Sequence, residues 1–353
     1  MSLMQVQSFV AGKWVTPESG LAPLHNACTG AVIGHAGTGA PDVMAMYHHA
    51  LTHGGPALRA MSFHDRARML KALAQYLSAR KAELYELSYL TGATKSDSWI
   101  DIDGGIGTMF VFASKGRREM PDSRVYLDGD VEMLSRGGSF VGQHVCTPLQ
   151  GVAVHINAFN FPVWGMLEKL APTLLAGMPA IIKPATVTGY VAEAAFRMIL
   201  ESGCLPDAAV QFVSGRLGPL LDELGPQDAV SFTGSADTAL ALRGTKNLLR
   251  NSVRFAAEQD SLNATILGGD VAVGDPEFDL FVKEVVTEIT AKAGQKCTAV
   301  RRILVPAPLR GPIAEALSDR LGEVTLGDPR LQAVGMGALA GAGQKQDVLG
   351  TCA

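Results

Sequence analysis

Between residues 41 and 90 the apolar positions recur at three- and four-residue steps, which is the spacing of one face of a helix. Ser62 and Asp65 have the spacing of a capping box at a helix start, and Gly92 ends the pattern. The repeated apolar positions are Met69, Leu70, Leu73, Leu77, Leu84 and Leu87. This part of the chain is therefore predicted to be helical.

From Gly151 onward, short runs rich in β-branched residues alternate with amphipathic stretches such as Trp164–Ala176 and Val191–Ser202. This alternation is typical of βαβ units and predicts an α/β fold with a Rossmann-like, doubly wound parallel sheet. Ligands of such sheets bind beyond the carboxyl ends of the strands, so functional residues are expected in the loops there. The expected strands are Val152–Ile156, Ala180–Lys183, Val210–Val213, Ala229–Phe232 and Val253–Ala256.

A second unit is predicted to begin near Leu262, because strand and helix patterns follow one another again from there. Its expected strands are Ala264–Leu267 and Val300–Val305, and its expected helices are Glu277–Ala293 and Leu309–Leu321. A tail rich in glycine and alanine follows. With 353 residues, two domains are the leading expectation.

Composition narrows the class of partner. Hydrophobic residues make up 47% and charged residues 18% of the chain, which favours well-buried cores. A formal charge of -4 gives no reason to expect nucleic acid or an anionic membrane, so a small molecule is the expected partner. The start lacks a secretory signal pattern, no apolar run has the length of a membrane span, and the five cysteines are scattered. We therefore expect a cytoplasmic protein without a metal site.

Cys297 is a candidate nucleophile. It follows a helical stretch in Lys292-Ala293-Gly294-Gln295-Lys296-Cys297-Thr298, at a loop tip before a predicted strand. Positive charge from Lys292 and Lys296 is expected to favour its thiolate, the form that attacks. An isolated cysteine is more often a small buried residue, so its neighbours decide between the two interpretations.

Two further residues have positions suited to catalysis. Asn160 lies between a strand end and a helix start, where its amide can point at an oxyanion or serve as an N-cap. Glu258 follows the last predicted strand of the sheet, where a carboxylate can act as a general base or be a surface residue.

The same loops contain candidates for binding a dinucleotide. Lys183 ends an apolar strand, and Phe232-Thr233-Gly234-Ser235 runs from a strand into a helix start, where backbone N–H groups bind phosphate. Gly215 and Gly218 are weaker candidates, because their spacing is not G-x-G-x-x-G. The predicted cofactor-binding residues are Ile156, Asn157, Phe159, Lys183, Ala185, Thr186, Gly215, Gly218, Phe232, Thr233, Gly234 and Ser235.

Taken together, these segments resemble the aldehyde dehydrogenase superfamily over residues 5 to 345. They are Asn160-Phe161-Pro162, Ile181-Ile182-Lys183-Pro184-Ala185, Phe232-Thr233-Gly234-Ser235, Glu258 and Gly294-Gln295-Lys296-Cys297. The chain is most similar to the aldehyde dehydrogenase domain of PaaZ-type enzymes of phenylacetate degradation and to the semialdehyde dehydrogenase of benzoyl-CoA degradation. Segments similar to this subgroup are Thr91–Thr94, Asp101–Gly107, Ile156–Pro162, Trp164–Pro172 and Asp260–Asn263.

The resemblance implies oxidation of an aldehyde, in that subgroup carried on a CoA thioester, to a carboxylic acid. Cys297 is then the nucleophile, Asn160 and the Cys297 backbone N–H form the oxyanion hole, and Glu258 activates the water that releases the acid. Many NAD-using relatives have glutamate where Thr186 stands, so NADP is expected to be preferred over NAD, with Lys183 near the 2′-phosphate.

The resemblance also implies a domain division. Residues 5–123 and 146–261 are expected to bind the dinucleotide, residues 124–145 to form an arm for a dimer or tetramer, and residues 262–353 to be the first part of the catalytic domain. The family's Glu-x-Phe-Gly-Pro motif and final strand do not occur, so the chain is expected to be C-terminally truncated. The alternatives are a dinucleotide-binding fragment without turnover and, disfavoured by the cofactor segments, a thiol-dependent acyltransferase or hydrolase.

Overall fold

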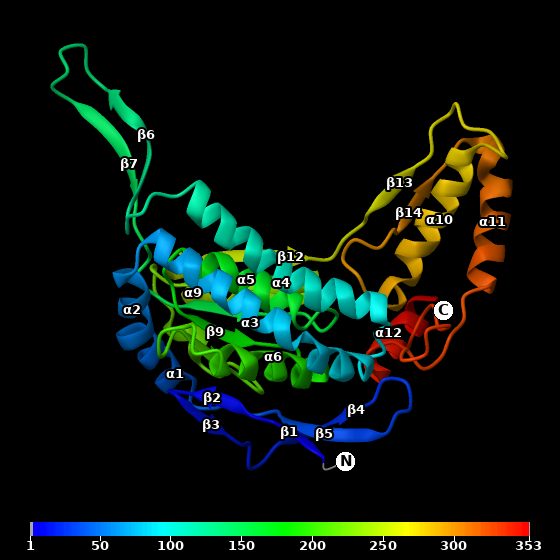
Figure 1. The fold of residues 1–353 in the computed structure, drawn as a ribbon, viewed down its shortest axis with the longest axis horizontal. Helices are drawn as coiled ribbons and strands as arrows, with labels where there is room; N and C mark the ends of the chain where they lie inside the picture. The colour runs from blue at the N-terminus through cyan, green and yellow to red at the C-terminus, as the bar shows by residue number, and fades with distance from the viewer. Residues whose placement is uncertain (1–2, 353) are drawn as a thin grey trace.

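A seven-stranded sheet lies at the centre of the computed structural model, which describes residues 3–352 (Figure 1). Its strands are, in spatial order, β12 (Arg254–Gln259), β11 (Ala229–Gly234), β8 (Ala153–Ile156), β9 (Ala180–Lys183), β10 (Val210–Phe212), β2 (Ser8–Val10) and β3 (Lys13–Val15). The strands from β12 to β10 are parallel, whereas β2 and β3 are antiparallel to their neighbours. The predicted parallel sheet is confirmed, and the hairpin at its edge was not foreseen.

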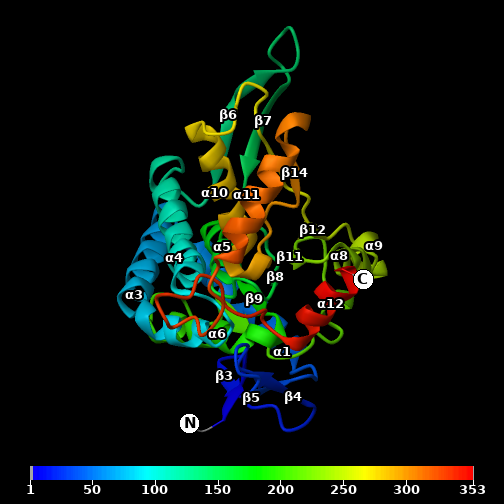
Figure 2. The same ribbon diagram turned by 90° about the vertical axis from the view of Figure 1, so that its right-hand side faces the viewer.

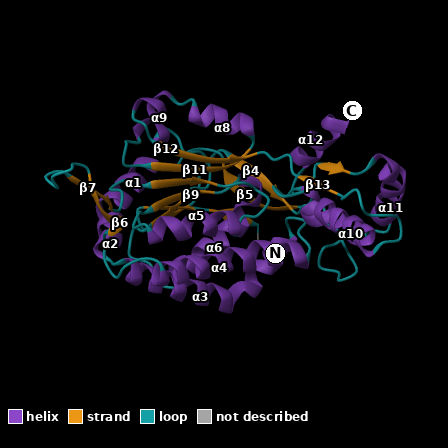
Figure 3. Ribbon diagram, turned by 90° about the horizontal axis from the view of Figure 1, so that it is seen from above, coloured by secondary structure: helices purple, strands orange, loops and turns teal. Residues whose placement is uncertain are grey.

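Helices cover both faces of this sheet (Figure 3). One face packs against α5 (Trp164–Leu175) and α6 (Gly189–Glu201), with α3 (Phe63–Tyr89) and α4 (Lys95–Arg118) outside them. The helices α1 (Val43–His49), α7 (Leu220–Glu223), α8 (Ala236–Arg243) and α9 (Lys246–Arg250) contribute to the core on the other face. In β9, Ala180 and Ile182 belong to the first core and Ile181 to the second, as the alternation of side chains along a strand requires.

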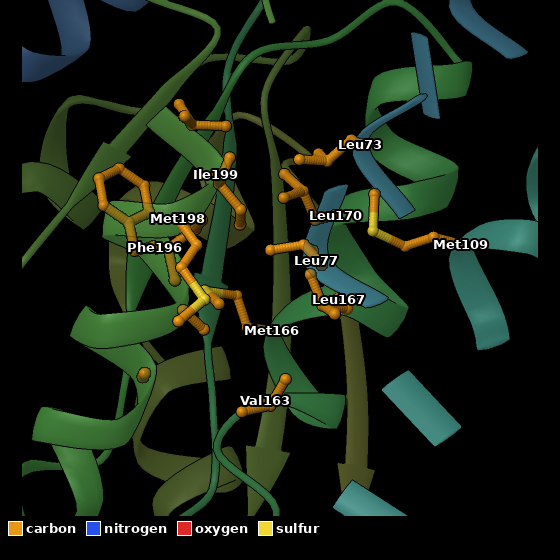
Figure 4. Packing of buried hydrophobic residues seen from close by; sticks show 14 of the residues in the cluster. Leu73, Leu77, Met109, Val163, Met166, Leu167, Leu170, Phe196, Met198 and Ile199 are labelled. Atoms are coloured by element: carbon orange, nitrogen blue, oxygen red, sulfur yellow. The ribbon is translucent and has the colours of Figure 1, made fainter. Parts of the chain in front are cut away.

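The long helices α3 and α4 both begin with a capping box. In α3 the Ser62 hydroxyl accepts the Asp65 backbone N–H at 3.1 Å, and an Asp65 carboxylate oxygen accepts the Ser62 N–H at 3.0 Å. Thr94 and Asp97 make the same exchange at the start of α4. Leucines of α3 and α5 then interlock with α6 in a fully buried core (Figure 4). The helix start predicted at Ser62 is confirmed.

A hairpin and a small sheet extend this body. The hairpin β6 (Tyr126–Met133) and β7 (Val141–Cys146) is antiparallel and projects away from the rest of the chain (Figure 1). The small sheet has the order β1 (Met4–Val6), β5 (Val32–Gly37), β4 (Leu21–His25). The remaining short elements are η1 (Ala50–Gly54), α2 (Gly55–Ala60) and η2 (Thr186–Thr188).

The second unit has its own core and lies beside the sheet (Figures 1 and 2). Strands β13 (Ala264–Ile266) and β14 (Arg302–Leu304) are parallel, and α10 (Pro276–Thr290) packs on α11 (Arg310–Gly322). The helix predicted to reach Ala293 ends at Thr290 and is followed by η3 (Ala291–Gly294). Two short pieces, η4 (Ala307–Leu309) and the unpredicted α12 (Ala342–Cys352), complete the unit. Between residues 3 and 352, none of the helices combines the length and apolarity needed to cross a bilayer.

A buried histidine in the central sheet makes stability depend on pH. His155 in β8 is 1% exposed, its Nε2 lies 3.0 Å from the Thr173 hydroxyl, and burial and the Lys169 charge lower its pKa to about 3. Below pH 6.5 the unfolded chain binds a proton that the folded chain refuses, so stability is lost as pH falls from 6.5 toward 3. At pH 5 the expected loss is about 2 kcal/mol.

Urea unfolding at neutral pH and at pH 5 measures this loss. We expect His155→Gln, whose amide can still bond Thr173, to lack most of the loss that the wild-type chain shows. The exposed His144→Gln is the matched control and should retain it. An unchanged pH dependence in His155→Gln would contradict the assignment.

Candidate active site

The strand register brings the predicted functional loops to one edge of the sheet. Ile156 lies opposite Lys183 on one side and opposite Phe232 on the other, and Thr233 lies opposite Glu258. The chain runs from β8 through β9 to β10 and then returns to place β11 on the other side of β8. The order of the strands therefore reverses between β8 and β11, where a crevice for ligands is expected in such sheets.

A pocket of about 230 Å³ lies at this edge. It brings together the three predicted catalytic residues Cys297, Glu258 and Asn160, which are far apart in the sequence. Its other lining residues are Ile100, Ala158, Phe161, Trp164, Gly165, Glu168, Thr233, Lys296 and Thr298. Aromatic and aliphatic walls around a few polar groups are typical of a small-molecule site.

Cys297 is exposed and is held through its backbone. Its carbonyl oxygen accepts hydrogen bonds from the Ser261 hydroxyl and from the Asn263 amide nitrogen, the latter at 2.5 Å. The same amide also donates to the Ala299 carbonyl at 3.2 Å. Partial burial raises the pKa of the Cys297 thiol, and the charge and hydrogen bond of Glu258 raise it further. The thiol thus lies beside a carboxylate that can accept its proton.

The prediction that neighbouring lysines favour the thiolate is wrong. Lys292 is only 2% exposed, and its ammonium donates to the Thr91 hydroxyl at 2.7 Å. Lys296 forms an ion pair with Glu288 at 2.8 Å. The thiol pKa is raised and not lowered, because desolvation and Glu258 dominate.

Glu258 and Asn160 approach the pocket from different strands. Glu258 is exposed in β12, and the hydroxyl of Thr233 in β11 lies 3.5 Å from its carboxylate. Asn160 is half-buried in the loop between β8 and α5, where the Thr188 hydroxyl donates to the Phe159 carbonyl at 2.9 Å. Within residues 3–352 no hydrogen bond engages the Asn160 side chain, so its amide remains available to a ligand.

The crevice between β8 and β11 has groups that suit a phosphate-bearing ligand. Ser235 caps α8 by accepting the Thr238 N–H at 3.3 Å, so Gly234 and Ser235 form a helix start. Lys183 at the end of β9 is half-buried, and burial lowers its pKa. Asn157 is 4% exposed, and neither polar atom of its amide has a partner among the described residues. A buried group of this kind is commonly satisfied by a ligand or by water.

Other predicted cofactor residues have a more local explanation. A Cβ atom on Gly215 would lie 2.0 Å from the Gly39 carbonyl oxygen, and one on Gly218 would lie 2.9 Å from the Ala40 Cβ. Both glycines therefore allow close packing against the loop that precedes α1. Ile156 and Phe232 are buried in the core, while Ala185 and Thr186 are half-buried at the start of η2.

Two pocket residues were not predicted to be functional. The indole nitrogen of Trp164 donates to one carboxylate oxygen of Glu168 at 2.9 Å, and Lys169 bonds the other oxygen at 2.9 Å. Trp164 and Glu168 are four positions apart in α5 and so share one helix face. Both residues lie in Trp164–Pro172, a segment that resembles the subgroup, so their four-residue spacing could have indicated a shared role.

Sequence similarity to known proteins indicates one enzyme family. A sequence profile of the aldehyde dehydrogenase family matches residues 14–353. The chain is 42% identical to a 3,4-dehydroadipyl-CoA semialdehyde dehydrogenase of Aromatoleum evansii over 97% of this chain and 66% of that protein. It is 26% identical to an alpha-ketoglutaric semialdehyde dehydrogenase of Bacillus subtilis, over 97% of this chain and 68% of that protein.

A solved structure of a betaine aldehyde dehydrogenase from Staphylococcus aureus, a point mutant in complex with NAD+, has the same fold. The TM-score is 0.83 at 21% identity, over 98% of this chain and 67% of that one. The predicted resemblance to semialdehyde dehydrogenases of aromatic degradation is confirmed. The chain spans about two thirds of the length of the curated relatives it matches.

Proposed function

Because the chain belongs to the aldehyde dehydrogenase family, we propose that it oxidises an aldehyde to a carboxylic acid with NADP or NAD. The observation that carries this proposal is the meeting of Cys297, Glu258 and Asn160 in one pocket at the carboxyl edge of the sheet. A nucleophile, a base and an oxyanion donor are the groups that oxidation through a covalent acyl-enzyme requires.

The first step is attack by Cys297. The raised pKa keeps the thiol protonated at neutral pH, so its proton passes to the adjoining Glu258 carboxylate as sulfur bonds to the aldehyde carbon. The carbonyl oxygen becomes an alkoxide, which the Asn160 amide stabilises as a hydrogen-bond donor. The product of this step is a thiohemiacetal on Cys297.

A bound nicotinamide would supply the hydride acceptor for the thiohemiacetal carbon, and Cys297 would then carry a thioester. Lys183, Asn157 and the helix start at Ser235 are the residues that would hold this cofactor. They fit it by the charge of Lys183, the unpaired amide of Asn157 and the N-terminus of α8, where the Ala236 N–H donates to an Asp260 carboxylate oxygen at 3.2 Å. Glu258 passes the proton taken from the thiol to solvent and then accepts a proton from water, whose hydroxide attacks the thioester carbon and displaces the Cys297 thiolate. Glu258 returns this second proton to the thiolate. The acid is released and the thiol is restored.

We propose a substrate in which the aldehyde ends an aliphatic chain joined to a CoA thioester. The 42% identity to an enzyme named for such a semialdehyde supports this class. In the pocket itself, Ile100, Phe161 and Trp164 provide apolar walls that suit an aliphatic chain. Retention of Glu258 favours water over CoA as the acyl acceptor.

An assay of reduced nicotinamide by ultraviolet absorbance tests the activity. We expect the purified chain to reduce NADP with an ω-oxoacyl-CoA thioester, and to release one carboxylic acid for each nicotinamide reduced. Nicotinamide reduction that requires added CoA would contradict water as the acceptor. NADP binding without any reduction would support the alternative, a dinucleotide-binding fragment without turnover.

The proposed preference for NADP rests on Thr186, which has no charge to repel the 2′-phosphate. Thr186→Glu should weaken NADP binding at least about 10-fold and leave NAD binding within about 3-fold, because only NADP carries the phosphate. Titration calorimetry with both nucleotides measures this change. The uncharged Thr186→Gln is the matched control, and equal losses in the two variants would reject the electrostatic explanation.

We propose that the hairpin β6–β7 forms contacts between copies of the chain. Its apolar side chains are largely exposed, which is unusual for an isolated two-stranded ribbon in water. These residues are Leu127, Val131, Met133, Phe140, Val141 and Val145. Burial against a second copy would remove this apolar surface from solvent.

A further inference from the structure

The loop that carries Cys297 has an unusual backbone. Lys292, Ala293 and Gly294 follow one another with φ values of 52°, 53° and 73°, all in the left-handed region. This conformation suits glycine but costs a residue with a side chain about 1 to 2 kcal/mol. Two such residues in a row persist only where surrounding contacts hold them.

Lys292 is held at both ends by residues near the start of α4. Its backbone N–H donates to Oδ1 of Asp97 at 2.7 Å, and its ammonium donates to the Thr91 hydroxyl at 2.7 Å. Burial lowers the pKa of Lys292 to about 8, against the charges of Asp101 and Asp97, which favour the ammonium. A buried lysine with these partners fixes the loop to a segment nearly 200 residues earlier.

The same helix also holds the loop that carries Asn160. Asp101 is 3% exposed, and its Oδ1 accepts the backbone N–H groups of Val163 at 3.0 Å and Trp164 at 2.7 Å. A Cβ on Gly105 would lie 2.9 Å from the Trp164 Cα, so α4 and the start of α5 are in close contact. The subgroup-like segment Asp101–Gly107 is thus explained by this contact.

The two anchor points are coupled through charge. Asp101 binds the start of α5 and also attracts the Lys292 ammonium, while Asp97 binds the Lys292 backbone. Beyond Lys292, Gln295 donates to the Lys292 carbonyl at 2.9 Å and accepts the Ala340 N–H at 3.0 Å. The loop that carries Cys297 and the loop that carries Asn160 are therefore both held by the same helix, α4.

We propose that Lys292, Asp97 and Asp101 form a buried clamp that positions Cys297 relative to Asn160, which makes Lys292 a positioning residue for thiol attack. The proposal rests on the proposed function, because it assigns the clamp to the attack by Cys297. Misplacement of a reacting group by about 1 Å can cost about 100-fold in rate.

The direction in which the pKa of the Cys297 thiol moves when Lys292 is replaced separates a positioning role from a direct charge effect. The charged residues that line the pocket with the thiol are Glu258 on β12, Glu168 on α5 and Lys296 in the same loop. Loss of a nearby positive charge would raise the thiol pKa. Release of the thiol from Glu258 and from partial burial would lower it, since those two causes raise it in the folded chain.

Alkylation of Cys297 by iodoacetamide, followed by peptide mass spectrometry at a series of pH values, gives this sign without any turnover. We expect Lys292→Met to move the midpoint to lower pH and to reduce kcat about 10- to 100-fold, with the KM for NADP within about 2-fold. Lys283→Met replaces an exposed lysine of α10 and is the matched control. A midpoint that rises or does not move in a folded Lys292→Met would overturn the proposal.

A second variant keeps the test valid if Lys292→Met fails to fold. Asp101→Asn removes one charge but keeps an oxygen for the Val163 and Trp164 N–H groups. The double variant of Lys292→Met and Asp101→Asn removes the Lys292 ammonium and the Asp101 carboxylate together and should recover part of the kcat lost in Lys292→Met. If the losses of kcat in the two single variants simply add in the double variant, the coupling between Lys292 and Asp101 is rejected. If the wild-type chain oxidises no aldehyde, but the alkylation midpoint still moves to lower pH in Lys292→Met relative to wild type, the proposed function is rejected and the clamp is kept.

Discussion

Cys297→Ala is expected to abolish aldehyde oxidation, with kcat/KM lower by at least about four orders of magnitude. The variant removes the only atom of the protein that bonds to substrate carbon in the proposed mechanism. Among the residues that line the pocket, no other cysteine is present to replace it. NADP affinity should stay within about 2-fold, since the proposed cofactor residues belong to other loops. Steady-state rates of nicotinamide reduction and calorimetry measure the two quantities.

Two controls make this result specific. Cys204→Ala replaces a half-buried cysteine outside the pocket and should retain wild-type rates. Cys297→Ser keeps the size of the side chain but offers a hydroxyl, which is a poor nucleophile without strong activation, and should be nearly as inactive as alanine. Substantial oxidation by Cys297→Ala would remove the basis of the covalent mechanism.

Glu258→Gln is expected to separate the two halves of the reaction. Without the carboxylate, water is not activated, and steady-state turnover should fall by about 100- to 10,000-fold. A first turnover should still occur, more slowly than in the wild-type chain, because loss of the Glu258 charge and hydrogen bond lowers the pKa of Cys297 and the thiol proton can pass to solvent instead of Glu258. Rapid mixing should therefore show a burst of one reduced nicotinamide per active site, followed by a very slow phase.

The pH dependence of Cys297 alkylation provides the control for this interpretation. Its midpoint should move to lower pH in Glu258→Gln, since the carboxylate raises the thiol pKa in the wild-type chain. Asp260→Asn, two positions further along the chain and outside the pocket lining, is the matched variant. If both the burst and the slow phase are lost, Glu258 is needed before the acyl-enzyme forms.

Much of the fold follows from local patterns in the sequence. The parallel sheet was indicated by short runs rich in apolar and β-branched residues that alternate with helical stretches, and the capping box at Ser62 is a local signal for a helix start. The meeting of Glu258 and Asn160 was also predictable in outline, because the carboxyl ends of parallel strands share one edge. Cys297 belongs to the second unit, and its role was expected from the family resemblance. The register that places Thr233 opposite Glu258 came only from the structure.

The features that were missed depend on contacts between distant segments. Helical periodicity continues through Lys292 in the sequence, but the bond from its N–H to Asp97 turns the chain into the left-handed region after Thr290. Lys292 is buried and its ammonium donates to the Thr91 hydroxyl. Its closeness to Cys297 in the sequence therefore did not make its charge favour the thiolate. The edge strands β2 and β3 were missed because they lie near the start of the chain, before the alternation of strand and helix patterns that marked the other strands of the sheet.

The central claim is that substrate carbon becomes covalently attached to Cys297, and trapping the acyl-enzyme tests it most directly. Glu258→Gln would be mixed with NADP and an ω-oxoacyl-CoA thioester, quenched in acid within the burst, digested and analysed by mass spectrometry. The account predicts one acyl group, on the peptide that contains Cys297, which disappears when NADP is omitted or when Cys297→Ala is introduced. If the sample has reduced one NADP per active site and the Cys297 peptide is unmodified, the account is contradicted.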